Sequence, residues 1–191
     1  MGPPPRASAA RLFVVSGPSG AGKGTVVRAF LFRHPEVFLS VSATTRPARP
    51  QEREGADYHF ISEPEFAAMR DRGAFLESAR VYDNYYGTLR QPVDEALSTG
   101  RSVLCELDIQ GALAVKRARP QAVLVFIEPP SHEELAARLR GRGTEGPEAL
   151  SVRAQAAYEE IKKKGLYDHV VVNDDLDNAV NELVRILEGH P

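Results

Sequence analysis

The stretch Leu12-Phe13-Val14-Val15-Ser16-Gly17-Pro18-Ser19-Gly20-Ala21-Gly22-Lys23-Gly24-Thr25 decides the fold. Its first four residues form an unbroken apolar run, which is typical of a strand buried on both faces of a parallel sheet. A glycine-rich turn follows, and after it Val26, Val27, Phe30 and Leu31 recur on one side of a helical pattern. A strand, a glycine-rich turn and a helix in this order predict a loop whose backbone N–H groups converge on phosphate.

The chemistry of this loop follows from its residue types. Glycines let the backbone curl, and the helix that follows adds its positive N-terminal end. Lys23 places a point charge between the β- and γ-phosphates of a nucleotide. The strict pattern has Ser or Thr directly after the lysine, whereas here Gly24 intervenes, so the hydroxyl that faces Mg²⁺ is expected to be that of Thr25. The predicted phosphate-binding residues are Gly17, Pro18, Ser19, Gly20, Ala21, Gly22, Lys23, Gly24 and Thr25.

Three more apolar runs recur downstream, at 103–107, 122–127 and 170–172. A helix-like segment follows each of them, beginning near Gln110, Ser131 and Asp175 respectively. Strands that alternate with helices imply right-handed crossovers. We therefore predict an α/β fold with a P-loop NTPase-type parallel sheet flanked by helices.

Two regions interrupt this alternation and predict the domain organisation. Residues 40–89 alternate short polar and aromatic segments, with a helix expected from Glu63 to Arg72, and residues 138–164 are charged and contain several glycines. We expect the first to be an insertion on the core and the second to be a helical lid. The remaining parts are a disordered tail (1–10) and a core nucleotide-binding domain (11–39, 90–137 and 165–191).

Composition excludes several classes of protein. The chain has 191 residues, 42% of them hydrophobic, and a formal net charge of −2. Such a balance does not suit a protein that coats nucleic acid or an anionic membrane. The longest apolar runs fall far short of the ~20 residues of a membrane span. The single Cys105 lies in an apolar run and is expected in the core, which suits a reducing cytoplasm.

The insertion carries a second candidate anion site. Arg46 and Arg49 stand three residues apart beside a cluster of hydroxyls, and Tyr58 and Tyr86 follow within the same region. Arginine forks together with tyrosine hydroxyls can bind a phosphate that is separate from the one at Lys23.

The ordered blocks of this chain resemble the guanylate kinase family, over roughly Leu12 to Leu187. The matching blocks are 17–25, 42–49, 57–58, 75–77, 86–88, 106–111, 141–144 and 172–174. The resemblance implies an enzyme that uses ATP, with Mg²⁺, to phosphorylate GMP and dGMP to the diphosphates by direct in-line transfer, as a part of purine metabolism.

The resemblance also implies roles for individual residues. Glu77 would read guanine, because one carboxylate can accept both the N1–H and the N2–H of this base. The implied GMP-binding residues are Ser42, Arg46, Arg49, Tyr58, Glu77, Tyr86, Thr88 and Glu106. The implied ATP-binding residues outside the loop are Arg138, Arg142 and Asn173. The implied catalytic residues are Lys23, Arg46, Arg142, Arg153 and Asp108, and Mg²⁺ would be held by Thr25 and Asp108, directly or through water.

Three alternatives compete with this interpretation. Asp108-Ile109-Gln110-Gly111 fits the D-x-x-G pattern of GTPase switches, but the sequence contains no Asn-Lys-x-Asp guanine-reading motif. Non-catalytic guanylate-kinase-like modules typically degrade the phosphate loop, which is intact here. A kinase for AMP would not explain Glu77. Ser78, Asp83 and Ala154 depart from the residues usual in the family, without removing a group needed for phosphoryl transfer.

Overall fold

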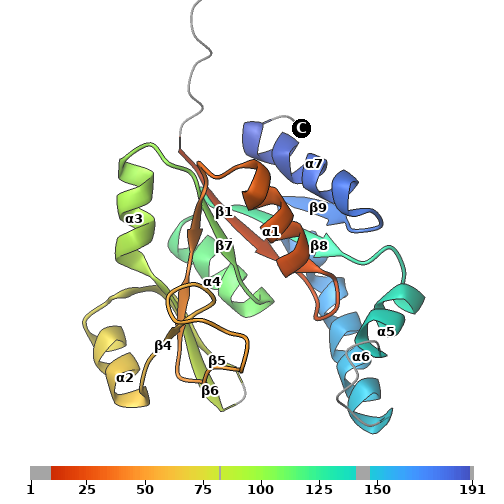
Figure 1. Cartoon of the computed structure of the whole chain (residues 1–191), viewed down its shortest axis with the longest axis horizontal. Helices are drawn as coiled ribbons and strands as arrows, with labels where there is room; N and C mark the ends of the chain where they lie inside the picture. The colour runs from red at the N-terminus through yellow and green to blue at the C-terminus, as the bar shows by residue number, and fades with distance from the viewer. Residues whose placement is uncertain (1–9, 82, 141–146, 190–191) are drawn as a thin grey trace, which may run out of the picture.

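The computed structural model describes residues 10–81, 83–140 and 147–189. Its centre is a five-stranded sheet in the order β2-β7-β1-β8-β9, with all neighbouring strands parallel (Figure 1). The strands are β1 (Leu12–Ser16), β2 (Phe38–Ser40), β7 (Val103–Glu106), β8 (Val123–Glu128) and β9 (His169–Val172). The predicted α/β class and parallel sheet are therefore confirmed. The four apolar runs read from the sequence are four of its five strands, and β2 was not predicted.

Helices cover both faces of the sheet. On one face α1 (Lys23–Arg33) and α7 (Leu176–Glu188) pack against Phe13 and Val15, and on the other α3 (Arg90–Ser98) and α4 (Ile109–Ala118) pack against Leu12 and Val14. Successive residues of β1 thus point to opposite faces, and both sides are apolar because both are buried. The buried Cys105 belongs to the second of these clusters, and burial raises the pKa of its thiol to about 12.

A second sheet occupies the insertion, in the order β4-β3-β6-β5 (Figure 1). Its strands are β3 (Ser42–Thr44), β4 (His59–Phe60), β5 (Phe75–Val81) and β6 (Asn84–Leu89), and α2 (Glu63–Asp71) covers it. This second sheet has a small hydrophobic cluster of its own, formed by Ala43, Phe66 and Phe75. The antiparallel register sets Thr88 opposite both Ser42 and Glu77 on the two neighbouring strands.

Gly87 is a packing requirement of this second sheet. A Cβ atom at this position would lie 2.7 Å from a ring carbon of the buried Phe75. We expect Gly87→Ala to lower the free energy of unfolding by about 1–3 kcal/mol, because the ring must leave its packed position. Thermal or denaturant unfolding measures this. Gly165→Ala is the matched control, since a Cβ there meets nothing within 4 Å, and equal effects of the two substitutions would contradict the prediction.

The last part of the fold is a helical arm made by α5 (His132–Arg140), α6 (Pro147–Ile161) and the 3₁₀ helix η1 (Lys162–Leu166) (Figure 1). Leu135 and Leu139 of α5 pack against Ala157 of α6. The boundary expected at residue 138 therefore falls within α5. Arg142 and the tail segment 1–9 lie outside the described residues. In the part of the chain that the structure describes, every helix is too short or too polar to cross a membrane.

Candidate active site

The glycine-rich loop connects β1 to α1 at the carboxyl edge of the five-stranded sheet. Gly22 caps α1 in a left-handed conformation, with φ of 87°, and the first turn of the helix carries no acidic residue. Gly17 has φ of 142°, and a Cβ there would come within 2.1 Å of the carbonyl oxygen of Ile127. The loop therefore depends on glycine at both positions, and the helix presents its positive end to an incoming anion.

Lys23 is folded over this loop. Its Nζ donates to the carbonyl oxygens of Gly17 at 2.6 Å and Pro18 at 3.1 Å. The ammonium group therefore lies against the loop backbone, where a phosphate held by the loop amides would meet it.

Side chains from distant parts of the chain hold the loop from outside. The Asn173 amide donates from Nδ2 to the carbonyl oxygen of Ala21 at 2.7 Å, and Arg138 donates from Nη2 to the carbonyl oxygen of Asn173 at 3.1 Å. Arg153 donates from Nη2 to Oγ of Ser19 at 3.0 Å. Three residues expected to bind ATP or to catalyse thus converge on the phosphate loop, and in this structure they contact its backbone and Ser19.

The predicted acceptor-phosphate residues also lie together. The Arg46 guanidinium is 5.5 Å from the centre of the Tyr58 ring, and the Tyr58 and Tyr86 rings meet edge to face at 5.9 Å. Burial raises the pKa of the Tyr58 hydroxyl, so it remains a proton donor at neutral pH. Arg49 is connected to Arg46 only through Glu52, which accepts from the backbone N–H of Arg49 at 2.8 Å and from Nη2 of Arg46 at 2.9 Å, and Arg49 itself is exposed.

The predicted base-reading residue lines a cavity of about 240 Å³ between the insertion and α4. Glu77 is 8% exposed, and its Oε1 accepts from the backbone N–H of Thr88 at 3.1 Å and from its Oγ1 at 2.7 Å. Burial raises the pKa of this carboxyl, while the two bonds from Thr88 lower it. Thr88 itself is fully buried. Its hydroxyl therefore holds the carboxylate, whereas Ser42 lines the cavity directly.

Glu106 and Asp108 mark the end of β7, where the two halves of the site meet. Both line the 240 Å³ cavity and also a second cavity of about 450 Å³. Desolvation raises the pKa of the Glu106 carboxyl, whereas the positive charges of Lys23 and Arg28 lower it. Asp108 caps α4, with its Oδ1 accepting from the backbone N–H of Gly111 at 2.7 Å.

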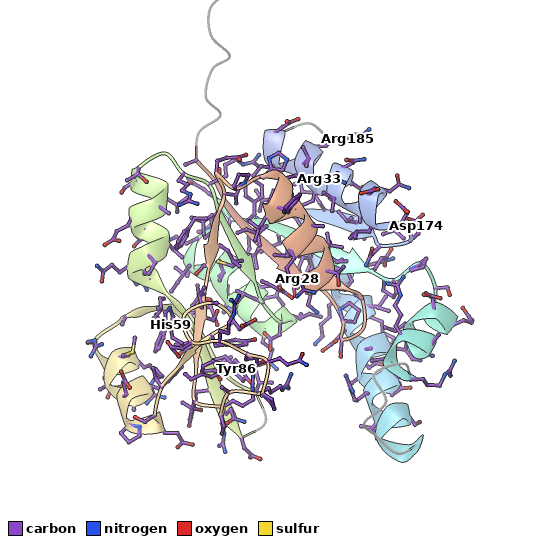
Figure 2. All side chains as sticks on the ribbon, viewed as in Figure 1. Arg28, Arg33, His59, Tyr86, Asp174 and Arg185 are labelled. Atoms are coloured by element: carbon purple, nitrogen blue, oxygen red, sulfur yellow. The ribbon has the colours of Figure 1, made fainter. Side chains whose placement is uncertain are left out.

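The second cavity connects the two predicted phosphate sites. Lys23 lines it from the loop side, and Ser42 and Tyr58 line it from the insertion. Figure 2 labels Arg28 on α1, which lines this cavity, and Tyr86 on β6, which lines the cavity of about 240 Å³. The loop therefore shares this cavity with Tyr58, and Tyr86 lines the adjoining one, whereas Arg46 and Arg49 are not among the residues that line either cavity.

Sequence reasoning missed several charged residues at this site, among them Arg53 and Asp57, which line the second cavity. Arg28 and Glu52 line the second cavity, and Glu160 of α6 accepts from the backbone N–H of Ser19 at 3.4 Å. Arg28 stands four residues after Gly24 and three after Thr25 on a predicted helix, which could have indicated that it shares their face. Glu52 and Glu160 carried no such signal, because turns and distant elements determine their contacts.

The fold and the glycine-rich loop after its first strand define a class, the P-loop proteins. Comparison with known proteins then identifies the family. The guanylate kinase family model matches residues 9–190. The chain belongs to the guanylate kinase family, whose known activity is the phosphorylation of GMP by ATP.

Individual relatives agree with this assignment. The chain is 51% identical over 177 residues to a guanylate kinase of Gloeobacter violaceus, covering 93% of this chain and 86% of the relative. It is 48% identical over 176 residues to a guanylate kinase of Clostridium perfringens, covering 92% and 82% respectively. The crystal structure of a guanylate kinase from Anaplasma phagocytophilum superposes with a TM-score of 0.78 at 33% identity, covering 95% of this chain and 86% of that one.

Proposed function

We propose that this chain transfers the γ-phosphoryl group of ATP to GMP, and to dGMP, across the cavity that Lys23 shares with Tyr58. The observation that carries the proposal is this shared cavity, because direct transfer requires both phosphates in one space. In this proposal the phosphate loop holds ATP, and the insertion (40–89) holds GMP. The helical arm closes over the ATP. A nucleophilic side chain is not needed, since a phosphate oxygen of GMP attacks the γ-phosphorus in line.

The proposed roles follow the surroundings of each group. Glu77 accepts the N–H donors of guanine, Ser42 contacts the base, and Glu106 faces the acceptor nucleotide. Arg46, Arg49, Tyr58 and Tyr86 bind its phosphate. Lys23 neutralises charge on the β- and γ-phosphates, while Arg138 and Arg153 approach the donor from the arm. Closing the site excludes water, which prevents wasteful hydrolysis of ATP.

Members of this family generally use Mg²⁺ with ATP, and the residues at the proposed metal site fit that ion. Mg²⁺ in nucleotide kinases takes one or two protein oxygens and obtains its other ligands from phosphates and water. Asp108 and Lys23 line the same cavity, and Thr25 lies in the first turn of α1. We propose that these two side chains hold the ion, directly or through its waters. Bound there, it would neutralise charge that develops on the transferring group.

Arg46→Ala tests the acceptor site. We expect it to lower kcat/KM for GMP about a hundredfold, because a charge-assisted bidentate contact to the phosphate is lost. KM for ATP should change little, since Arg46 belongs to the insertion. A coupled assay of ADP release measures both constants. Arg70→Ala is a suitable control, since Arg70 lies on the outer helix α2 and pairs with Asp71. Unaltered GMP kinetics in the Arg46 variant would refute the assignment.

The same assay tests the proposed function as a whole. With ATP and Mg²⁺ present, GMP should support ADP release far better than AMP, UMP or CMP. The buried carboxylate of Glu77 would be left unpaired by a base without two adjacent donors. Comparable rates with AMP and GMP would contradict the proposal.

A further inference from the structure

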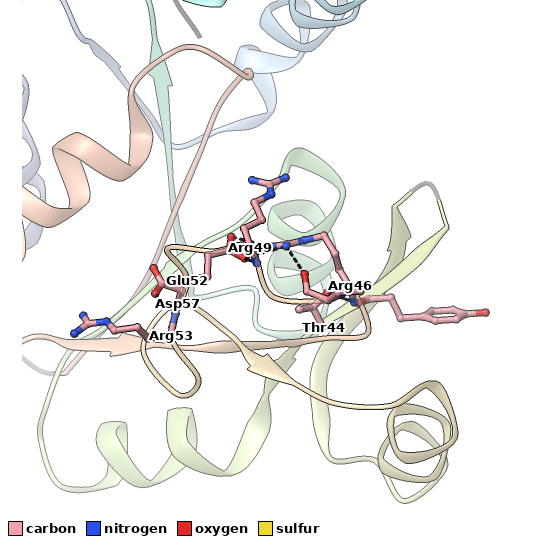
Figure 3. A network of polar contacts seen from close by, with 8 residues as sticks. Thr44, Arg46, Arg49, Glu52, Arg53 and Asp57 are labelled. Atoms are coloured by element: carbon pink, nitrogen blue, oxygen red, sulfur yellow. Dashed lines mark hydrogen bonds and ion pairs between the residues drawn. The ribbon is translucent and has the colours of Figure 1, made fainter. Parts of the chain in front are cut away.

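A carboxylate without an assigned role lies inside the proposed acceptor-phosphate site. Glu52 accepts from Arg46 twice, with Nη1 to Oε2 and Nη2 to Oε1 both at 2.9 Å. Its Oε2 also accepts from the backbone N–H of Arg49 at 2.8 Å. Figure 3 shows this network, in which Glu52 joins the two arginines of the predicted phosphate site.

The contact is sheltered from solvent and anchored to the chain. The side chain of Arg46 is 15% exposed and that of Glu52 is 17% exposed. The backbone N–H of Glu52 donates to the carbonyl oxygen of Arg49 at 2.9 Å, so a turn at 49–52 fixes the carboxylate at its backbone as well as at its side chain. Exposed ion pairs contribute little, but a sheltered bidentate pair with a further backbone bond holds a defined geometry.

A count of donors shows what this pairing leaves for a ligand. A guanidinium has five N–H groups, one on Nε and two on each η nitrogen. Glu52 takes one from each η nitrogen, and the second N–H of Nη1 donates to the carbonyl oxygen of Pro47 at 2.7 Å. Neither Glu52 nor Pro47 takes the N–H of Nε or the second N–H of Nη2, which lie side by side along one edge. The Tyr86 hydroxyl, itself a predicted phosphate ligand, is a further hydrogen-bond partner of this guanidinium. Two parallel N–H groups match two oxygens of a phosphate.

Other contacts keep that edge in place. The guanidinium lies 5.5 Å from the ring centre of Tyr58 and 6.0 Å from that of Phe60. Its pKa is raised, first by the hydrogen bond to Glu52 and then by an interaction with the Tyr86 hydroxyl. Glu52 pairs with the end of the guanidinium while the aromatic rings lie over its face, so the group has little freedom to rotate.

We infer that Glu52 is a positioning residue for the acceptor: it holds Arg46 so that the Nε–Nη2 edge is presented to the phosphate of a nucleoside monophosphate. This inference rests on the proposed function and deepens it. Glu52 does not contact the reacting atoms; it removes the need to order Arg46 when the nucleotide binds, and such preorganisation increases affinity.

Glu52→Gln is the decisive variant, because the amide keeps the shape of the side chain but loses its charge and one of its two acceptors. We expect the dissociation constant for GMP, measured by titration calorimetry, to rise about tenfold. The dissociation constant for guanosine should not change, since guanosine has no phosphate for Arg46 to bind. KM for ATP should stay within about twofold, because the donor loop belongs to the other sheet.

Glu54→Gln is the matched control. Glu54 lies in the same loop and accepts from the backbone N–H of Phe60 at 2.8 Å and contacts His59 at 3.1 Å, so it holds the loop without contacting Arg46. Its GMP affinity should equal that of the unmodified chain. A rise in the GMP dissociation constant that is equal in both variants would overturn the inference, as would an equal loss of guanosine binding in Glu52→Gln. Tighter GMP binding in Glu52→Gln would also overturn it, because Glu52 would then be a competitor of the phosphate.

A double-substitution cycle gives an independent test. In an Arg46→Lys background the fork is absent, so Glu52→Gln should weaken GMP binding by less than twofold, whereas independent effects would again give about tenfold. Failure of the inference differs from failure of the proposed function. In the first case the unmodified chain phosphorylates GMP and Glu52→Gln binds GMP equally well. In the second the unmodified chain does not phosphorylate GMP at all.

Discussion

Replacing Lys23 with alanine is expected to lower kcat by about a thousandfold or more, the largest effect of any substitution considered for this chain. The transferring phosphoryl group spreads negative charge over its oxygens in the transition state. The ammonium group of Lys23 lies against the loop, at 2.6 Å from the carbonyl oxygen of Gly17, and so would be close to that charge when ATP is bound. The charge that stabilises the transition state is lost in the variant, while the rest of the loop remains.

ADP release under saturating ATP and GMP measures this effect. Lys162→Ala is the control: its ammonium group pairs with Glu159 at 2.7 Å on the surface of the helical arm, and its removal should leave kcat unchanged. A melting temperature close to that of the unmodified chain would show that the Lys23 variant is folded. A folded Lys23→Ala variant that kept a tenth of the activity would exclude the proposed donor site.

Glu77→Gln should produce the second large effect, a fall of about a thousandfold in kcat/KM for GMP. The carboxylate offers only acceptors, whereas a glutamine amide places N–H donors against the N1–H or N2–H of guanine. The surroundings amplify this loss, because Glu77 is 8% exposed and a mismatched donor there cannot turn to water. Thr88 would continue to hold one oxygen, so the variant should keep the shape of the pocket.

The comparison variant for Glu77 is Ser78→Ala, because Ser78 is the next residue along β5 and its side chain is exposed. Neighbouring residues of a strand point to opposite faces, so this substitution should not affect guanine. The two variants are compared by steady-state kinetics with GMP as the varied substrate. Equal kcat/KM values for them would show that the base is read elsewhere.

The sequence predicted the core sheet well, because long apolar runs carry their own signal. The run at 122–127 became β8 (Val123–Glu128), and the expected helix from Glu63 to Arg72 became α2 (Glu63–Asp71). Asp175, expected near the start of a helix, caps α7 by accepting from the backbone N–H of Asn178 at 3.0 Å. Each of these elements follows from residues that are close together in the chain.

The second sheet and the details of the site were harder to predict. Strands as short as β4 (His59–Phe60) show no alternation, and they form only because β3 lies beside them. Thr88, one of the implied GMP-binding residues, lies on β6 between Ser42 and Glu77 and donates to the carboxylate of Glu77. The amide of Asn173, one of the implied ATP-binding residues, donates to the loop backbone at Ala21. These contacts join residues 11 and 152 positions apart, and so they depend on the finished fold.

The separate hydrophobic cluster of the second sheet has a consequence for how this enzyme family can change. Ala43, Phe66 and Phe75 pack among themselves, while Leu76 of β5 joins the interior of the larger sheet and ties the two layers together. The side chains proposed to recognise the acceptor nucleotide therefore belong to the second sheet, whose packing can change while Leu76 stays in place. Substitutions in this layer, natural or engineered, could therefore change which base is recognised without altering the part of the chain that would bind ATP.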